Sequence, residues 1–109
     1  MSKATVGDFI VDRLQQWGID RVFGYSGDGI NGVMSALRRN DGVTLVQPRH
    51  EELAAFMACG HAKYTGRPGA VVTTSGPGAI HALNGLYDAA KDHMPVVAVV
   101  GQQARISLG

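Results

Sequence analysis

The chain opens with apolar residues at the spacing of one helix face: Val6, Phe9, Ile10, Leu14 and Trp17. Thr5 followed by Asp8 has the form of a capping box, and Gly18 is a natural stop. The pattern therefore predicts a helix over residues 6–17, with polar residues on its opposite face.

Beyond this helix, strand-like apolar runs alternate with helical patterns. The runs are residues 21–23, 43–46, 70–74 and 96–100, and the third is rich in β-branched residues, as in a buried strand. Helical patterns fill the gaps at residues 30–39, from 50 to 66, and after residues 75–78. This alternation predicts an α/β fold: a doubly wound parallel sheet with helices on both faces.

Length and composition allow one domain and exclude several classes of protein. The 109 residues have a net charge of +1, which gives no electrostatic argument for binding nucleic acid or an acidic membrane. The longest apolar run, residues 96–100, is too short to span a bilayer, so we expect a cytoplasmic protein. Cys59 is the only cysteine, and its small apolar neighbours indicate a buried residue rather than a nucleophile.

Ligands of open parallel sheets bind beyond the carboxyl ends of the strands. Three segments fall there: one spanning residues 48–52, and two glycine-rich loops. The loop residues are Gly24, Tyr25, Ser26, Gly27, Asp28 and Gly29, and then Ser75, Gly76, Pro77 and Gly78.

The first loop also matches a dinucleotide fingerprint. Residues 27–32 read G-x-G-x-x-G, with Glu51 and Glu52 some twenty positions on. However, Gly27 lies three positions after Gly24, whereas the fingerprint glycine belongs at the strand end, and Glu51 lies beyond the second strand. A dinucleotide site stays open as a disfavoured alternative. Some of these glycines are explained by positive φ in a tight turn, whatever the function.

Glu51 is the strongest candidate for chemistry. Acids favour the first turn of a helix, and this explains Glu52. Glu51, however, precedes an apolar helix start, and there burial is expected to raise the pKa of its carboxyl group, partly opposed by the helix end.

Five motifs together resemble the thiamine-diphosphate-dependent enzymes, closest to the pyruvate oxidase and acetolactate synthase group. They occur in the order and spacing of that family over nearly the whole chain: FGYSG at 23–27, RHEELAAF at 49–56, TSGPG at 74–78, NGLYDA at 84–89 and DHMPV at 92–96. The resemblance implies a flavodoxin-like pyrimidine-binding domain, here incomplete. We expect the natural polypeptide to continue beyond Gly109, since its fourth strand would otherwise be an uncovered apolar edge.

The resemblance assigns Glu51 the role of cofactor activator. In the family, the glutamate after the histidine shares a proton with N1′ of the aminopyrimidine, which favours the imino tautomer that deprotonates the thiazolium. The resemblance also places both glycine-rich loops at the pyrimidine and Gln102 on the substrate side, although a polar strand cap explains Gln102 equally well. Mg²⁺ would be bound by a diphosphate domain that this chain lacks, and FAD binding is left open.

The residues after Gln102 depart from this pattern. Gln103-Ala104-Arg105 is closer to benzoylformate decarboxylases, which puts the substrate in doubt. His81 and His93 match family positions, and for both a role in packing or in supporting a site residue is favoured over catalysis. The irregular spacing of the four histidines, without a cysteine partner, predicts no metal site.

The resemblance implies a 2-keto acid substrate and a homodimer or homotetramer with the cofactor at a subunit interface. We expect the 109 residues alone to be inactive. Two other classes stay open: a non-catalytic interaction module of the same fold, and the dinucleotide-binding domain.

Overall fold

The computed structural model describes residues 3–108. Its strands are β1 (Arg21–Gly24), β2 (Thr44–Val46), β3 (Gly69–Thr73) and β4 (Val96–Val100). Its helices are α1 (Val6–Gln16), α2 (Asn31–Arg39), α3 (Glu51–Thr65) and α4 (Pro77–Lys91), and short 3₁₀ turns lie at Asp28–Ile30 and Arg105–Ser107. Every predicted element is present, and its ends lie within one residue or so of the expected ones.

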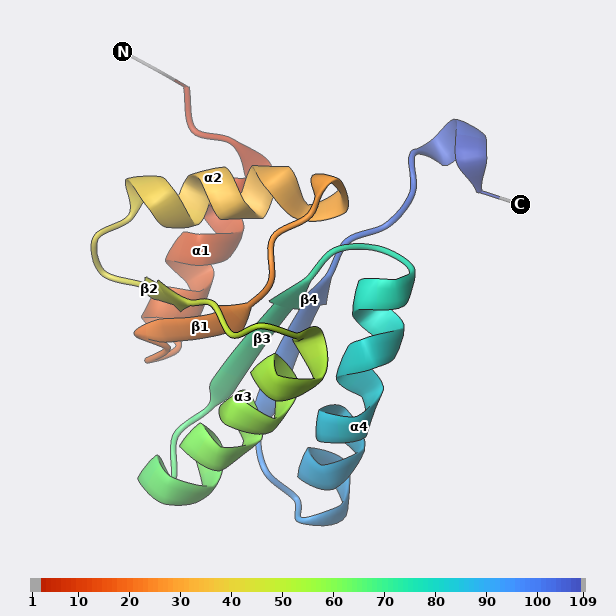
Figure 1. The fold of residues 1–109 in the computed structure, drawn as a ribbon. Coiled ribbons are helices and arrows are strands. Elements are labelled where there is room, and N and C mark those ends of the chain that lie inside the picture. Colours follow the sequence, from red (N-terminus) through yellow and green to blue (C-terminus); the bar gives the residue numbers. More distant parts are fainter. Residues whose placement is uncertain (1–2, 109) are drawn as a thin grey trace.

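The four strands form one parallel sheet in the order β2-β1-β3-β4 (Figure 1). The chain runs outward from β1 to β2, crosses back to β3 on the other side of β1, and continues to β4. The direction of winding therefore reverses between β1 and β3, which is where ligands bind in sheets of this order. The predicted doubly wound α/β fold is confirmed.

Helices cover both faces of the sheet, and each face has its own apolar core. The core on one side joins α1 and α2 to Val22 of β1 and Val72 of β3. The core on the other side joins α3 and α4 to Phe23 and Val71, which are adjacent to Val22 and Val72 in the same strands. This alternation of sides follows from the two-residue period of a strand.

The helices differ from expectation in which residues they bury. In α1, Val11 and Leu14 are buried, while Val6, Phe9 and Trp17 are more than half exposed. Small residues pack closely, so α1 meets α2 through Gly7, and a Cβ on Gly7 would collide with the backbone of Gly32. The larger residues are left at the edge of this contact.

Helices α3 and α4 show the same reversal. The buried residues of α3 are Ala54, Ala55, Ala58, Cys59 and Ala62, and those of α4 are Gly78, Ala82, Gly85 and Ala89. The larger apolar side chains point outward: Leu53, Phe56, Met57 and Tyr64 on α3, and Ile80, Leu83 and Tyr87 on α4. The expectation that the apolar start of α3 is buried thus holds for its alanines and is wrong for Leu53 and Phe56.

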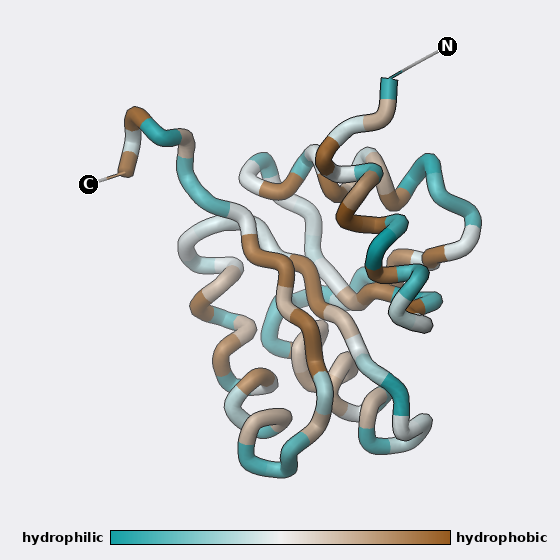
Figure 2. Tube along the Cα trace, turned by 180° about the vertical axis from the view of Figure 1, so that it is seen from behind, coloured by the Kyte–Doolittle hydropathy of each residue, from teal (hydrophilic) through white to brown (hydrophobic). Residues whose placement is uncertain are grey.

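Strand β4 lies at the edge of the sheet. In Figure 2, the brown, hydrophobic run of this strand has no other described segment in front of it. Val97 and Val99 line an apolar groove of about 290 Å³ together with Phe9 of α1 and Trp17, the residue that follows this helix. Of the helices within residues 3–108, none combines the length and apolar character of a membrane span. Gly109, where the expectation of a continuing chain falls, lies outside the described residues.

Candidate functional site

The two glycine-rich loops meet at the carboxyl ends of β1 and β3, as predicted. The backbone N–H of Gly29 donates to Oγ1 of Thr74 at 3.0 Å, and the N–H of Tyr25 donates to the carbonyl of Val72 at 3.3 Å. The bond to Thr74 holds the loop after β1 against the loop after β3, and the bond to Val72 holds it against β3 itself, where the winding reverses.

The glycines of the first loop serve close approach rather than unusual backbone angles. A Cβ on Gly27 would lie 2.6 Å from Cβ of Thr74, and one on Gly29 would lie 2.7 Å from its Oγ1. Among the described glycines, positive φ occurs at Gly18, Gly66 and Gly76. The tight-turn explanation is therefore wrong for the first loop and applies to Gly76 in the second, where φ is 64°.

An open pocket of about 560 Å³ lies between these loops and the segment after β4. Its lining residues are Asp28, Gly29, Thr74, Ser75, Gln102, Gln103 and Ala104. Gln103 donates from Nε2 to Oγ of Ser75 at 3.2 Å, while Oε1 of Gln102 accepts from the backbone N–H of Gln103 at 2.8 Å. Ser26 lines a different hollow, on the β2 side, with Gln47. The structure thus places Gln102 in the pocket between the loops, whereas Ser26 does not line that pocket.

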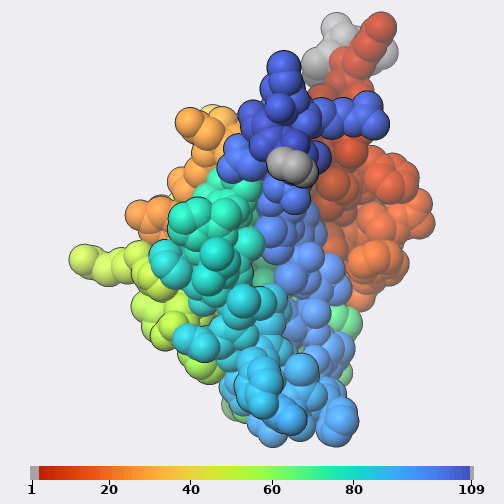
Figure 3. All heavy atoms as spheres, turned by 90° about the vertical axis from the view of Figure 1, so that its right-hand side faces the viewer, coloured from red at the N-terminus to blue at the C-terminus, as the bar shows by residue number. Residues whose placement is uncertain are grey.

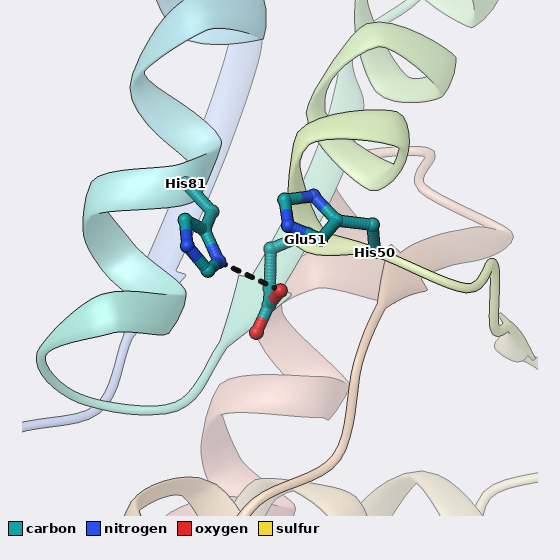
Figure 4. A group of neighbouring side chains, drawn as sticks. All are labelled: His50, Glu51 and His81. Carbon is teal, nitrogen blue, oxygen red and sulfur yellow. Dashed lines mark hydrogen bonds and ion pairs between the residues drawn. The ribbon is translucent and has the colours of Figure 1, made fainter.

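Glu51 is the first residue of α3 and points toward α4 (Figure 4). Its side chain is only 13% exposed, and Oε1 lies 3.2 Å from Nδ1 of His81, which is 44% exposed. His50 precedes the helix, and its Nδ1 accepts the backbone N–H of Glu52 at 3.1 Å, which makes it the N-cap of α3. The rings of His50 and His81 stack with centroids 4.3 Å apart.

The pKa of Glu51 is lowered, which corrects the expectation that it would be raised. Burial does raise this pKa and is the largest single influence. The hydrogen bond from the residue's own backbone N–H, the hydrogen bond from His81 and the electrostatic influence of His81 and His50 together outweigh it. The burial of Glu51 was expected from the apolar start of its helix, whereas His81 comes from a different helix and is brought to Glu51 only by the fold.

His50, Glu51 and His81 also place three potential metal-ligand atoms within 4.8 Å of one another. This cluster was not expected from the irregular spacing of the four histidines along the chain. The N-cap nevertheless argues against a metal centre. A histidine that ligates through Nε2 carries a proton on Nδ1, whereas Nδ1 of His50 must stay unprotonated to accept the N–H of Glu52. The arrangement fits a carboxylate paired with a histidine better than a metal centre.

Thr74 and Gly78 contribute to the site although neither was assigned a specific contact. Thr74 accepts the hydrogen bond that joins the two loops, and a Cβ on Gly78 would lie 2.9 Å from Cγ2 of Thr74 and 3.2 Å from Oε2 of Glu51. The signal in the sequence was the position of Thr74 between a buried strand and a glycine-rich loop. The dependence of Glu51 on Gly78 is visible only in three dimensions.

Comparison with known proteins gives one family. A family model described as "Thiamine pyrophosphate enzyme, N-terminal TPP binding domain" matches residues 4–109. The chain is 45% identical over its whole length to the Bacillus subtilis protein YdaP, covering 19% of that protein. It is 43% identical to pyruvate oxidase of Lactiplantibacillus plantarum, with 88% of this chain and 16% of the oxidase aligned.

A further relative is a chloroplastic acetolactate synthase of Arabidopsis thaliana, 40% identical over 94% of this chain and 15% of the synthase. The chain therefore spans less than a fifth of the length of these three relatives. The family model and the alignment with YdaP both span the strands, the two loops and Glu51. The chain belongs to the thiamine pyrophosphate enzyme family, as its N-terminal cofactor-binding domain.

Proposed function

We propose that this chain is the pyrimidine-binding part of a thiamine-diphosphate-dependent enzyme that decarboxylates a 2-keto acid, as a pyruvate oxidase or an acetolactate synthase does. Glu51 is the residue that activates the cofactor. Family membership and the names of two relatives support the class of enzyme.

The observation that supports this role of Glu51 is the burial of its carboxyl group and the position of its two oxygens. It is largely buried at the start of a helix, beside the loops of the winding reversal, and one of its oxygens faces a glycine. Such a group can accept a hydrogen bond from a ring nitrogen that enters beside Gly78. The residues present therefore fit an aminopyrimidine.

Thiamine diphosphate, when bound, supplies the nucleophilic carbon and the electron sink that decarboxylation of a 2-keto acid needs. The contribution of this chain is to bind the pyrimidine end and to hold a proton between Glu51 and the ring. Mg²⁺ and the diphosphate belong to a part of the whole protein outside these 109 residues. FAD as an additional cofactor is a property to be measured on the whole protein.

The test is carbon dioxide release from pyruvate and from benzoylformate by the whole protein, with and without thiamine diphosphate and Mg²⁺. Glu51→Gln removes the exchangeable proton and should lower kcat by about 100-fold or more. The matched control is Glu52→Gln. Glu52 is the next residue of α3, and its Oε2 accepts from Nδ2 of Asn84 at 2.7 Å, a bond that the amide oxygen of glutamine preserves.

Cofactor-dependent release that collapses in Glu51→Gln and survives in Glu52→Gln supports the proposal. Full activity of Glu51→Gln would contradict it. The 2-keto acid that the whole protein prefers decides the subgroup. Benzoylformate is included because Gln103, which donates to Ser75 at the pocket, belongs to the segment that resembles benzoylformate decarboxylases. Benzoylformate as the better substrate would favour a non-oxidative decarboxylase.

The whole protein is proposed to be a homodimer or homotetramer with the cofactor between subunits. The exposed apolar side chains of α3 and α4 support this, because they begin two residues after Glu51, at Leu53. The same side chains would serve a non-catalytic interaction module of this fold. Such a module would bind its partner normally after Glu51→Gln, whereas the enzyme would lose activity.

We expect the 109-residue chain alone to bind thiamine diphosphate weakly and to release no carbon dioxide. Its described residues place a carboxylate and two loops at the pyrimidine end, and the three relatives compared are more than five times its length. Isothermal titration of this chain with thiamine diphosphate and Mg²⁺ tests the expectation. Micromolar affinity would overturn it.

A further inference from the structure

The two oxygens of the Glu51 carboxylate lie in different surroundings (Figure 4). Oε1 is 3.2 Å from Nδ1 of His81. Oε2 lies on the side of Gly78, where an added Cβ would approach it to 3.2 Å. One oxygen is therefore engaged by a side chain of α4, and the other faces a position of α4 without a side chain.

The N-cap of α3 determines which histidine can donate a hydrogen bond from Nδ1 to Glu51. Nδ1 of His50 accepts the N–H of Glu52, so the ring proton of neutral His50 resides on Nε2. His50 stacks on His81 at 4.3 Å and supports its ring. Nδ1 of His81 does not cap a helix in this way, so it can carry the ring proton and donate to Oε1 of Glu51. This tautomer follows from the hydrogen-bond partners.

We propose that His81 is a positioning residue for Glu51, holding Oε1 so that Oε2 is presented to the pyrimidine nitrogen in the space that Gly78 leaves open. The proposal rests on the proposed function, in which Glu51 contacts that ring. Glutamate has several rotatable bonds, and fixing its carboxylate before the ligand arrives avoids the entropy cost of ordering it at that moment.

The surroundings of Glu51 are simple enough to test this. Within residues 3–108, the ionisable side chains that act on its pKa are His81 from α4 and His50 from the turn before α3, and both lower it. The loop after β3 contributes Thr74 and the first turn of α4 contributes Gly78, and neither carries a charge. The effect of removing His81 can therefore be assigned to the pair.

The first measurement needs no cofactor. The pKa of Glu51 is followed by the ¹³C shift of its side-chain carboxyl carbon in the protein and in two variants. His81→Phe keeps a ring for His50 to stack on and removes the donor, so the pKa of Glu51 should rise toward or above its ordinary 4.5. His81→Gln restores an N–H donor without a charge and should give an intermediate value. An unchanged pKa in His81→Phe would overturn the proposal.

The second measurement separates the two oxygens in the whole protein. Gly78→Ala places a methyl group 3.2 Å from Oε2 and 2.9 Å from Cγ2 of Thr74 and leaves His81 in place, so cofactor affinity should fall by about 10- to 100-fold while the pKa of Glu51 stays low. Gly60→Ala is the matched control, because a Cβ there meets nothing within 4 Å. His81→Phe should lower kcat at saturating cofactor and shift the acidic limb of the pH profile to higher pH.

The outcomes distinguish this proposal from the proposed function. If Glu51→Gln keeps full activity, the proposed function fails, whatever the pKa measurements show. If Glu51→Gln is inactive but Gly78→Ala binds the cofactor normally, or if His81→Phe leaves the pKa of Glu51 and the pH profile unchanged, the assignment of the two oxygens fails and the proposed function stands.

Discussion

Glu51 shows how a single residue combines opposing influences. Burial favours its neutral form, while its own backbone N–H, His81 and His50 favour the carboxylate and prevail. The sequence places this acid at a helix start, which already favours a charge. The contribution of His81, thirty residues away, required the tertiary structure.

The lowered pKa of Glu51 predicts a pH dependence of stability. Because the folded pKa lies below the ordinary 4.5, Glu51 stabilises the fold above about pH 4.5, and this contribution is lost as the pH falls through the folded value. Urea denaturation should show a larger difference between the protein and Glu51→Gln near pH 6 than near pH 3. A difference independent of pH would show that the pairing is absent in solution.

Cys59 is predicted to be unreactive in the folded protein. It is 1% exposed, and its pKa is raised first by burial and then by the hydrogen bond from Sγ to Asp88, at 3.5 Å. Ellman's reagent should label it slowly in buffer and rapidly in denaturant. As the chain holds one cysteine, the readout is unambiguous, and rapid labelling of the folded protein would contradict the burial. The expected burial of Cys59 is confirmed, and its lack of nucleophilic reactivity stays a prediction.

Among the elements, the contact between α3 and α4 positions the site. The two helices lie side by side, and Glu51 with His81, Glu52 with Asn84 and Lys63 with Asp88 form a ladder of polar pairs along them. Beneath the ladder, Gly85 meets the backbone of α3, which brings the helices close enough for the pairs to form.

We predict that Gly85→Ala destabilises the fold by about 1–3 kcal/mol, since overpacking forces the helices apart. A Cβ there would lie 2.5 Å from Cβ of Ala55 and 2.6 Å from the backbone nitrogen of Phe56, which cannot yield without moving α3. Urea denaturation measures the loss. The control is Gly60→Ala in α3, which meets nothing within 4 Å and should be neutral or up to about 1 kcal/mol more stable.

At the scale of the whole molecule, one side of the fold is apolar and open. In the space-filling view of Figure 3, α4 and β4 lie together at the surface. Ile80, Leu83 and Tyr87 form a stripe along α4 and are each more than half exposed. Because large exposed apolar groups mark association surfaces, this face is suited to contact with another protein surface.

The α4 stripe predicts that the 109-residue chain self-associates as its concentration rises. Leu83→Glu places a charge in the stripe at a position that is 58% exposed, so it should weaken association without unfolding the protein. Sedimentation velocity over a range of concentrations measures this. Ile106→Glu, at a 95% exposed position after β4, is the matched control, and an equal effect of both variants would exclude the stripe as the contact.

The sequence by itself determined the elements, the fold class and the position of the acid. Strand and helix periodicity, the Thr5 cap and the glycine stops depend on neighbouring residues, and for that reason they could be predicted to within about a residue. Parallel strands also have all their carboxyl ends at one edge of the sheet, so the alternation predicts that both loops and Glu51 lie at that edge, whereas the reversal of winding is seen only in the strand order of the structure.

Only the tertiary structure decided which helix faces are buried and what surrounds Glu51. Apolar periodicity identifies a helix, but its rotation depends on close approach, and here glycine and alanine allowed contacts that leave Leu53, Phe56 and Leu83 outside. The pairing of Glu51 with His81 and the open side at Gly78 depend on that rotation in two helices at once. No local pattern encodes such a relation, because it arises from packing between segments far apart in the chain.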